Sequence, residues 1–203
     1  MKNKITTFIF DIGNVLLFFD HQIIVKRFEK LSGMPAKKIY CSMFDPGFIN
    51  GFETGRISEK NFYKTVCAKL GIKISFSQFR EIFSNIFTPN ASIYKLIKSL
   101  KGKYRICILS NTDRTHFEYI QKRYPVINIF DSYYLSYKLN AMKPETRIFR
   151  TVLEGEKVKP KECVYTDDIK HNIIKANKLG INAIQFKSTS QFKKSLKKYG
   201  INL

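Results

Sequence analysis

The chain has 203 residues, 44% of them hydrophobic and 14% aromatic, which excludes a globally disordered protein and suits one domain with a large insertion or two small domains. Its net charge of +20 favours anionic partners, but the basic residues are spread along the chain. We therefore favour solvated surface lysines over a nucleic-acid site, and because no apolar run approaches the roughly 18 to 20 residues of a membrane helix we expect no membrane partner.

The first part of the chain predicts one buried strand followed by a series of helices. Residues 5–10 form a short apolar, β-branched and aromatic run, which is typical of a strand buried on both faces. From residue 21 to about residue 90 the apolar residues recur at helical spacing, with helix stops at Gly33, Asp45-Pro46-Gly47, Gly71 and Pro89. No strand is compelling in this part, so we expect a helical insert of about 70 residues, a size that can form a small module.

Strands and helices alternate after the insert. We expect strands over 104–109, 131–137, 163–166 and 181–186, and helices over 93–100, 114–123, 145–153 and 169–179, with a short basic helix at the end. This alternation predicts an α/β fold, a doubly wound parallel sheet covered by helices on both faces. The core is expected to comprise residues 1–18 and 91–203, and a helical cap residues 19–90.

Four short segments place polar residues at the ends of predicted strands or at a predicted helix start. They read FIFDIGNV from residue 8, ILSNT from residue 108, MKPE from residue 142 and VYTDD from residue 164. Ligands of open α/β sheets bind beyond the carboxyl ends of the strands, so Asp11, Ser110 and the Asp167-Asp168 pair should converge on one crevice. Taken singly, plain structural roles are favoured: a turn-forming residue for Asp11, a helix N-cap for Asp167-Asp168 and a solvated lysine for Lys143, while Ser110 could cap a helix and bind a ligand at once.

Together, the side chains of these segments favour phosphate chemistry. The Asp11 carboxylate can attack phosphorus and form an aspartyl-phosphate. Asp167 and Asp168 add the hard oxygen ligands that Mg²⁺ prefers. Ser110 and Asn111 precede a helix and could hold phosphate oxygens, while Lys143 would act as a point charge on them.

In this order and at these intervals, the four segments resemble the signature motifs of the haloacid dehalogenase (HAD) superfamily, whose commonest members are Mg²⁺-dependent phosphatases with an Asp nucleophile. The resemblance covers essentially the whole chain and implies a Rossmann-like core with an inserted cap. It implies Asp11 as nucleophile, Lys143 as its catalytic partner and Mg²⁺ held by Asp11, Asp167, Asp168 and the carbonyl of Gly13. The expected substrate is a small phosphorylated metabolite.

Gly13 departs from the usual pattern of that superfamily. Most of its phosphatases carry a second Asp at this position, which serves as general acid and base. The version in this chain most resembles small sugar phosphatases related to the N-terminal domain of soluble epoxide hydrolases. A good leaving group needs less protonation, so a hexose 1-phosphate is a reasonable substrate. Asp20 or His21 could replace the missing donor, although a hinge-turn role is favoured for both.

Residues 52–58 of the expected cap resemble a substrate-facing loop of that subgroup. Glu53 could accept hydrogen bonds from substrate hydroxyls, and Arg56 could attract the substrate by charge. A plain surface turn explains the Thr54-Gly55 pair equally well.

Several alternative functions remain. A haloacid dehalogenase proper lacks an acid pair such as Asp167-Asp168, a phosphotransferase would resemble Asp-x-Asp where Gly13 stands, and a receiver-type domain has no such insert. A non-catalytic relative could bind nucleic acid or protein through its basic surface. The four cysteines show no C-x-x-C spacing, and we expect a cytoplasmic protein.

Overall fold

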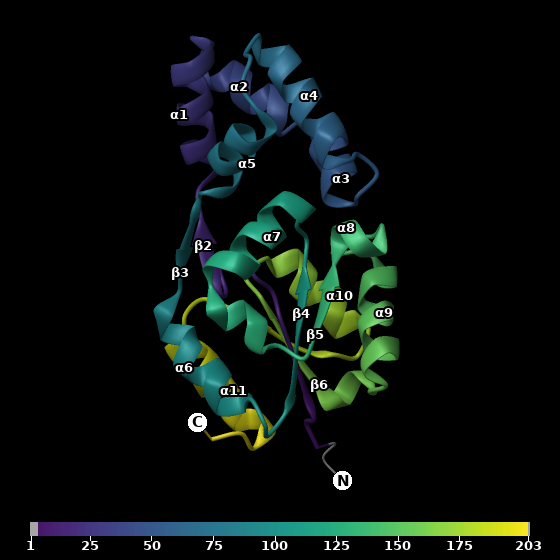
Figure 1. Cartoon of the computed structure of the whole chain (residues 1–203). Helices are drawn as coiled ribbons and strands as arrows, with labels where there is room; N and C mark the ends of the chain where they lie inside the picture. The colour runs from purple at the N-terminus through teal and green to yellow at the C-terminus, as the bar shows by residue number, and fades with distance from the viewer. Residues whose placement is uncertain (1–3, 203) are drawn as a thin grey trace.

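In the computed structural model, which describes residues 4–202, five parallel strands form a central sheet (Figure 1). The strands lie in the order β5-β4-β1-β6-β7. Their bounds are β1 Thr7–Phe10, β4 Arg105–Ser110, β5 Ser132–Leu135, β6 Cys163–Asp167 and β7 Asn182–Gln185. In the middle of the sheet, Phe10 of β1 pairs with Ile108 of β4 and Thr166 of β6. The parallel order confirms the predicted α/β fold.

Helices cover both faces of this sheet. The buried side chains of β1 alternate between two hydrophobic clusters, with Phe8 and Phe10 on one face and Ile9 on the other. The cluster around Phe8 is covered by α6 (Ala91–Leu100), α7 (Arg114–Arg123) and α11 (Thr189–Leu196). The cluster around Ile9 is covered by α9 (Thr146–Glu156) and α10 (Lys170–Lys178).

A second layer of helices lies beyond one end of the sheet and has its own core (Figure 1). It is reached through an antiparallel pair of short strands, β2 (Leu17–Phe19) and β3 (Phe87–Pro89). Aromatic rings fill this core, and the Phe52 and Phe62 rings stack with their centroids 4.0 Å apart. Its helices are α1 His21–Ser32, α2 Ala36–Met43, α3 Pro46–Glu53, α4 Glu59–Leu70 and α5 Phe76–Ser84.

Helix α3 was not predicted. Asp45-Pro46-Gly47 was interpreted as a helix stop, yet it also starts the next helix: the Asp45 side chain accepts from the Phe48 N–H at 3.1 Å, and Pro46 occupies the first turn. Glu53 is consequently the last residue of a helix.

The structure also differs from the prediction near residues 131–146. The predicted strand over 131–137 ends early, because α8 (Ser136–Leu139) begins at Ser136. Pro144 was expected at the start of a helix, but α9 begins at Thr146. Short 3₁₀ segments complete the described fold: η1 Pro125–Ile129, η2 Pro160–Glu162 and η3 Lys197–Tyr199.

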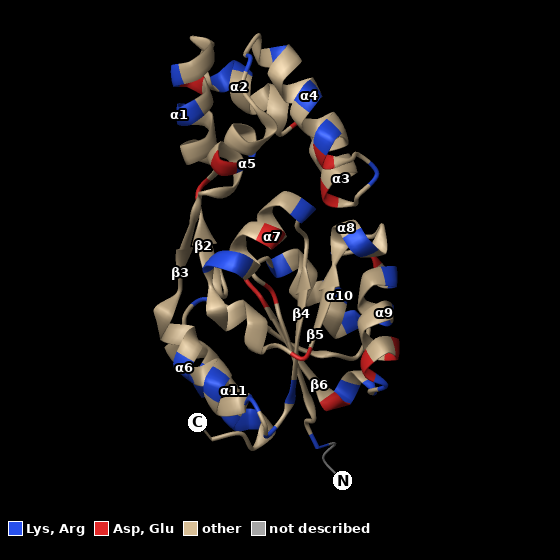
Figure 2. Ribbon diagram, viewed as in Figure 1, with Lys and Arg blue, Asp and Glu red and all other residues tan. Residues whose placement is uncertain are grey.

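Lys and Arg are distributed over the helices of both layers (Figure 2). Among residues 4–202, no helix has the length and apolar character needed to cross a membrane.

Candidate active site

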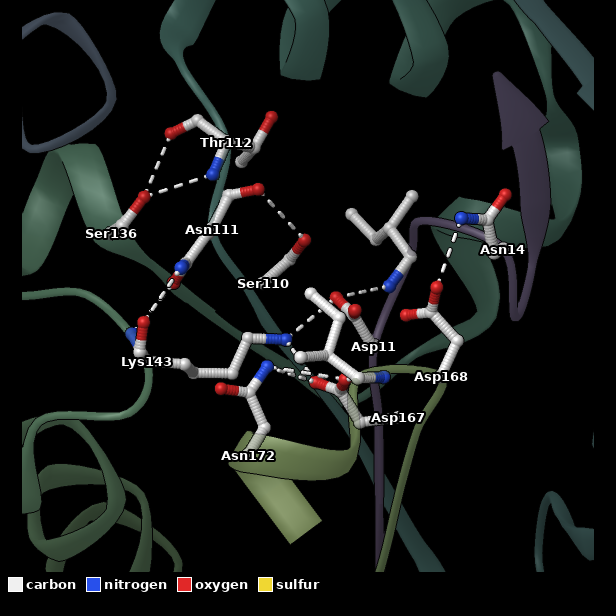
Figure 3. A network of polar contacts seen from close by, with 12 residues as sticks. Asp11, Asn14, Ser110, Asn111, Thr112, Ser136, Lys143, Asp167, Asp168 and Asn172 are labelled. Atoms are coloured by element: carbon white, nitrogen blue, oxygen red, sulfur yellow. Dashed lines mark hydrogen bonds and ion pairs between the residues drawn. The ribbon is translucent and has the colours of Figure 1, made fainter. Parts of the chain in front are cut away.

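The sheet register brings the four sequence segments to one edge of the core (Figure 3). Asp11 follows β1 directly, Ser110 is the last residue of β4 and Asp167 is the last residue of β6. Since these strands are adjacent and parallel, their carboxyl ends meet. Asp11, Ser110 and Asp167 thus lie at one edge, where the sequence predicted that they converge, and all three are buried.

Lys143 lies between two carboxylates. Its Nζ is 2.9 Å from Asp11 Oδ1 and 2.6 Å from Asp167 Oδ2, and only 4% of the residue is exposed. Although burial disfavours the ammonium, Asp11 and Asp167 outweigh this effect and raise the pKa of Lys143. Burial raises the pKa of Asp11 to about 7, while Lys143 acts in the opposite direction.

Asn111 fixes the backbone of Lys143. Its Oδ1 accepts from the Lys143 N–H at 2.8 Å, and its Nδ2 donates to the Lys143 carbonyl at 3.0 Å. This double contact joins the end of β4 to the segment before α9. The Asn111 side chain therefore positions the lysine, a contact that the sequence did not predict.

Both oxygens of Asp167 are already occupied by protein donors. Oδ1 accepts from the Ile169 N–H at 2.7 Å, and Oδ2 accepts from the Tyr165 hydroxyl as well as from Lys143. Asn172 Nδ2 donates to both oxygens. Burial opposes the ionisation of Asp167, but these contacts, led by Lys143, outweigh it and lower its pKa. Asp167 is held as an anion that anchors Lys143.

Asp168 is half-buried and lies on the side of Asp11 opposite Lys143 (Figure 3). Its Oδ2 accepts from Asn14 Nδ2 at 2.9 Å, and Asn14 adopts the left-handed conformation with φ of 52°. Carboxylate oxygens of Asp11, Asp167 and Asp168 lie within 4.8 Å of one another. Such a set of hard oxygen donors fits Mg²⁺. Asn14 was not among the predicted site residues.

A cavity of about 90 Å³ lies beside this cluster, between the sheet and the second layer. Residues from the core and from the helical layer line it, including Gly13, Ser110, Asn111, Thr112, His21 and Glu53. Arg56 does not line it: this residue is exposed, and its Nε donates to Thr54 Oγ1 at 3.0 Å. The structure thus brings Glu53, but not Arg56, to the predicted site.

Ser136 connects Glu53 to the core. Its Oγ lies 2.6 Å from the Glu53 carbonyl and 2.9 Å from the Thr112 carbonyl, and it accepts from the Thr112 N–H at 2.9 Å. The last turn of α3 is thereby held against the segment that follows Ser110. Sequence reasoning missed Ser136, because it was assigned to a strand.

Two histidines also line the cavity, and they differ in their contacts. His116 is buried, with Nδ1 2.6 Å from Asp113 Oδ2 and Nε2 3.0 Å from the Phe83 carbonyl. Burial lowers its pKa, but Asp113 and Phe83 outweigh this and raise it overall. His21 stacks on Phe44 with centroids 4.6 Å apart, and burial lowers its pKa to about 4.

Asp20, the other residue considered as a proton donor, caps α1. Its Oδ1 accepts from the Gln22 N–H at 2.8 Å, which is the ordinary role of an Asp at a helix start. The same helix-start pattern, an Asp directly before a predicted helix, is present at Asp113, three residues before His116. Asp113 caps α7 by accepting from the His116 N–H at 2.9 Å.

Residues 9–186 match the family described as Haloacid dehalogenase-like hydrolase, and the chain belongs to this family. The resemblance drawn from the four motifs is thus confirmed. D-ribitol-5-phosphate phosphatase from Bacteroides thetaiotaomicron is 26% identical over 200 residues, which cover 95% of this chain and 97% of that protein.

Solved structures also resemble the chain. A HAD family enzyme from Bacteroides thetaiotaomicron, in complex with magnesium and inorganic phosphate, superposes with a TM-score of 0.83 at 27% identity, covering 91% of this chain and 96% of that one. L-2-haloacid dehalogenase from Xanthobacter autotrophicus, with chloropropionic acid covalently bound, has a TM-score of 0.64 at 15% identity, covering 96% and 83%. The second likeness concerns the fold alone.

Proposed function

We propose that this chain is a Mg²⁺-dependent phosphatase that hydrolyses a small phosphate monoester through attack of Asp11 on phosphorus. The observation that carries the proposal is the position of Lys143, whose ammonium contacts Asp11 at 2.9 Å and is anchored by Asp167. A carboxylate that attacks a phosphate dianion needs a cation at this distance, because two anions otherwise repel each other.

Asp11, Asp168 and the backbone carbonyl of Gly13 would hold the Mg²⁺ ion. Asp167 would support it less directly, since both of its oxygens already accept hydrogen bonds. The ion supplies charge that offsets the repulsion between Asp11 and the phosphate and orients the phosphoryl group. The relative crystallised with magnesium and inorganic phosphate supports this choice of metal.

The other residues of the site would bind and orient the phosphoryl group. Ser110 is buried at the end of β4 and lines the cavity, so its hydroxyl can donate to a phosphate oxygen. Asn111 acts on the substrate through Lys143, which it holds at both backbone atoms. Asp11 is buried at this edge, so attack would occur in surroundings with little water.

We further propose that residues 19–90 act as a cap over the substrate. The cavity is bounded on the cap side by Glu53 and His21, whose polar side chains suit the hydroxyl groups of a polyol or sugar phosphate. The relative named D-ribitol-5-phosphate phosphatase supports this class. This class of substrates includes both a hexose 1-phosphate and a pentitol phosphate. A reducing cytoplasm would suit the cysteines, three of which are buried thiols.

Phosphate release with Mg²⁺ tests the proposal across D-ribitol 5-phosphate, glucose 1-phosphate, glucose 6-phosphate, nucleotides and 4-nitrophenyl phosphate. We expect Asp11→Asn to remove activity and to keep the fold. Asp45→Asn is the matched control, because Asn serves equally well at that exposed helix start. Full activity of Asp11→Asn, or equal turnover after chelation of the metal, would contradict the mechanism. If the folded wild-type protein releases no phosphate from any of these esters, the result would favour a non-catalytic relative.

A further inference from the structure

The proposed reaction leaves one chemical requirement unmet beside Asp11. When the ester bond breaks, the leaving oxygen gains an electron pair, and an alkoxide from a sugar or polyol needs a proton. Proton transfer by a positioned side chain is typically worth about 10² to 10⁴ in rate. Gly13 offers no side chain for this purpose.

Glu53 lies in the cavity with its carboxyl uncommitted. It lines the cavity together with Gly13 and Ser110, and among residues 4–202 its side chain has no hydrogen-bond or ion-pair partner. Its backbone is nevertheless fixed, because the Ser136 hydroxyl lies 2.6 Å from the Glu53 carbonyl and 2.9 Å from that of Thr112. The carboxyl is therefore free to act and is carried on a held backbone.

The other titratable groups around the cavity are committed elsewhere. Both ring nitrogens of His116 have partners, Asp113 and the Phe83 carbonyl. Asp113 uses both oxygens on His116. His21 is held neutral at pH 7, because burial lowers its pKa to about 4, so it has no proton to give from a cationic ring.

We propose that Glu53 is the proton donor and acceptor of the reaction, taking the part for which Gly13 has no side chain. This inference rests on the phosphatase function proposed above. In the first step an Asp11 oxygen bonds to phosphorus, the ester bond breaks, and the leaving oxygen takes the Glu53 proton. In the second step water attacks phosphorus, the bond between phosphorus and Asp11 breaks, and a proton of the water passes to the Glu53 carboxylate.

The surroundings of Glu53 suit both protonation states. Burial raises the pKa of Glu53 to about 7, and the Asp113 carboxylate acts in the same direction, while His116 and Lys143 oppose it. Glu53 is also the last residue of α3, where the helix dipole disfavours a negative charge. A carboxyl poised near neutral pH can give a proton and take one back.

The test compares leaving groups that need a proton with one that does not. Alkyl esters (D-ribitol 5-phosphate, glucose 6-phosphate and glycerol 3-phosphate) release alkoxides, whereas 4-nitrophenyl phosphate releases a stabilised phenolate. In Glu53→Gln we expect kcat/KM to fall by about 10² to 10⁴ on the best alkyl ester and by less than about tenfold on the aryl ester. In Glu53→Gln, kcat/KM on the alkyl ester should no longer fall at high pH, where the wild type loses the Glu53 proton. In Glu53→Asp part of this pH dependence should return.

Glu81→Gln is the matched control, because Glu81 is exposed on α5 of the same layer. Equal losses on alkyl and aryl esters in Glu53→Gln, an unchanged pH profile, or a wild type that turns over only the aryl ester would overturn the assignment of Glu53 while leaving the phosphatase function in place. Activity that persists in Asp11→Asn, or a wild type inactive on every ester, would instead overturn the proposed function and this inference with it.

Discussion

The side-chain amide of Asn172 donates to both carboxylate oxygens of Asp167, at 3.1 and 3.0 Å. Here the amide supplies a donor to a buried anion that also holds Lys143, so Asn172 helps to fix the position of that lysine.

Asn172→Asp should therefore destabilise the protein at neutral pH. The change replaces a donor with a second buried carboxyl beside Asp167, and we expect the free energy of unfolding at pH 7 to fall by about 1 to 3 kcal/mol. The deficit should shrink as the pH is lowered and one of the two carboxyls protonates. Denaturant unfolding at several pH values measures this. Asn61→Asp, at an exposed position of α4, should change stability by less than about 0.5 kcal/mol.

Lys143→Met should remove both activity and stability. The variant leaves the buried carboxylates of Asp11 and Asp167 without their shared cation, and loss of one partner from a buried ion pair costs about 3 to 5 kcal/mol. We expect no measurable phosphate release under conditions where the wild type is active. Lys161→Met, at an exposed position, is the control. A stable variant with near wild-type turnover would show that the lysine serves neither purpose.

Gly13→Asp should not simply restore a proton donor. A Cβ at this position would lie 2.8 Å from Phe19 Cε1, so the ring would have to move. We expect the single variant to be destabilised and no more active than the wild type, and Gly13→Asp combined with Phe19→Ala to accommodate the new side chain. Thermal unfolding and phosphate release, compared across Gly13→Asp, Phe19→Ala and the double variant, measure the coupling.

The ion pair between His116 and Asp113 should make stability depend on pH. Because the pKa of His116 is raised in the folded protein, the folded state keeps its proton at pH values where the unfolded chain has lost it. This contribution is fully present below about pH 6.5, the ordinary histidine value, and is lost as the pH rises through the folded-state pKa. The difference in unfolding free energy between wild type and His116→Gln should thus be larger at pH 6 than at pH 9. A difference that stays constant over this range would rule out the linkage.

The sequence was a good guide to the core because its signals are local. Apolar runs that end in polar residues located β1, β4 and β6, and the parallel-sheet rule then placed Asp11, Ser110 and Asp167 at one edge. Helix α7 was predicted with the bounds that it has, Arg114–Arg123.

The parts that were missed depend on contacts between distant residues or on a signal with two meanings. Asn14 meets Asp168 across 154 positions, and Ser136 meets Glu53 across 83. Helical spacing and turn residues are local patterns and give no information about such long-range contacts. The Asp45-Pro46-Gly47 segment can mark either the end or the start of a helix. Because it was interpreted only as an end, α3 and the position of Glu53 at its last residue were missed.

The pairing of β2 with β3 affects how the helical layer could change during evolution. Because the chain leaves the core at Phe19 and returns at Phe87, directly opposite in the antiparallel register, the two attachment points lie side by side. For the core, residues 20–86 are equivalent to the loop of a hairpin, and the entropy of closing a loop grows only slowly with its length. The helical layer could therefore be lengthened, shortened or exchanged for another without a new register in the central sheet, and the arrangement of Asp11 and Lys143 in the core would stay the same.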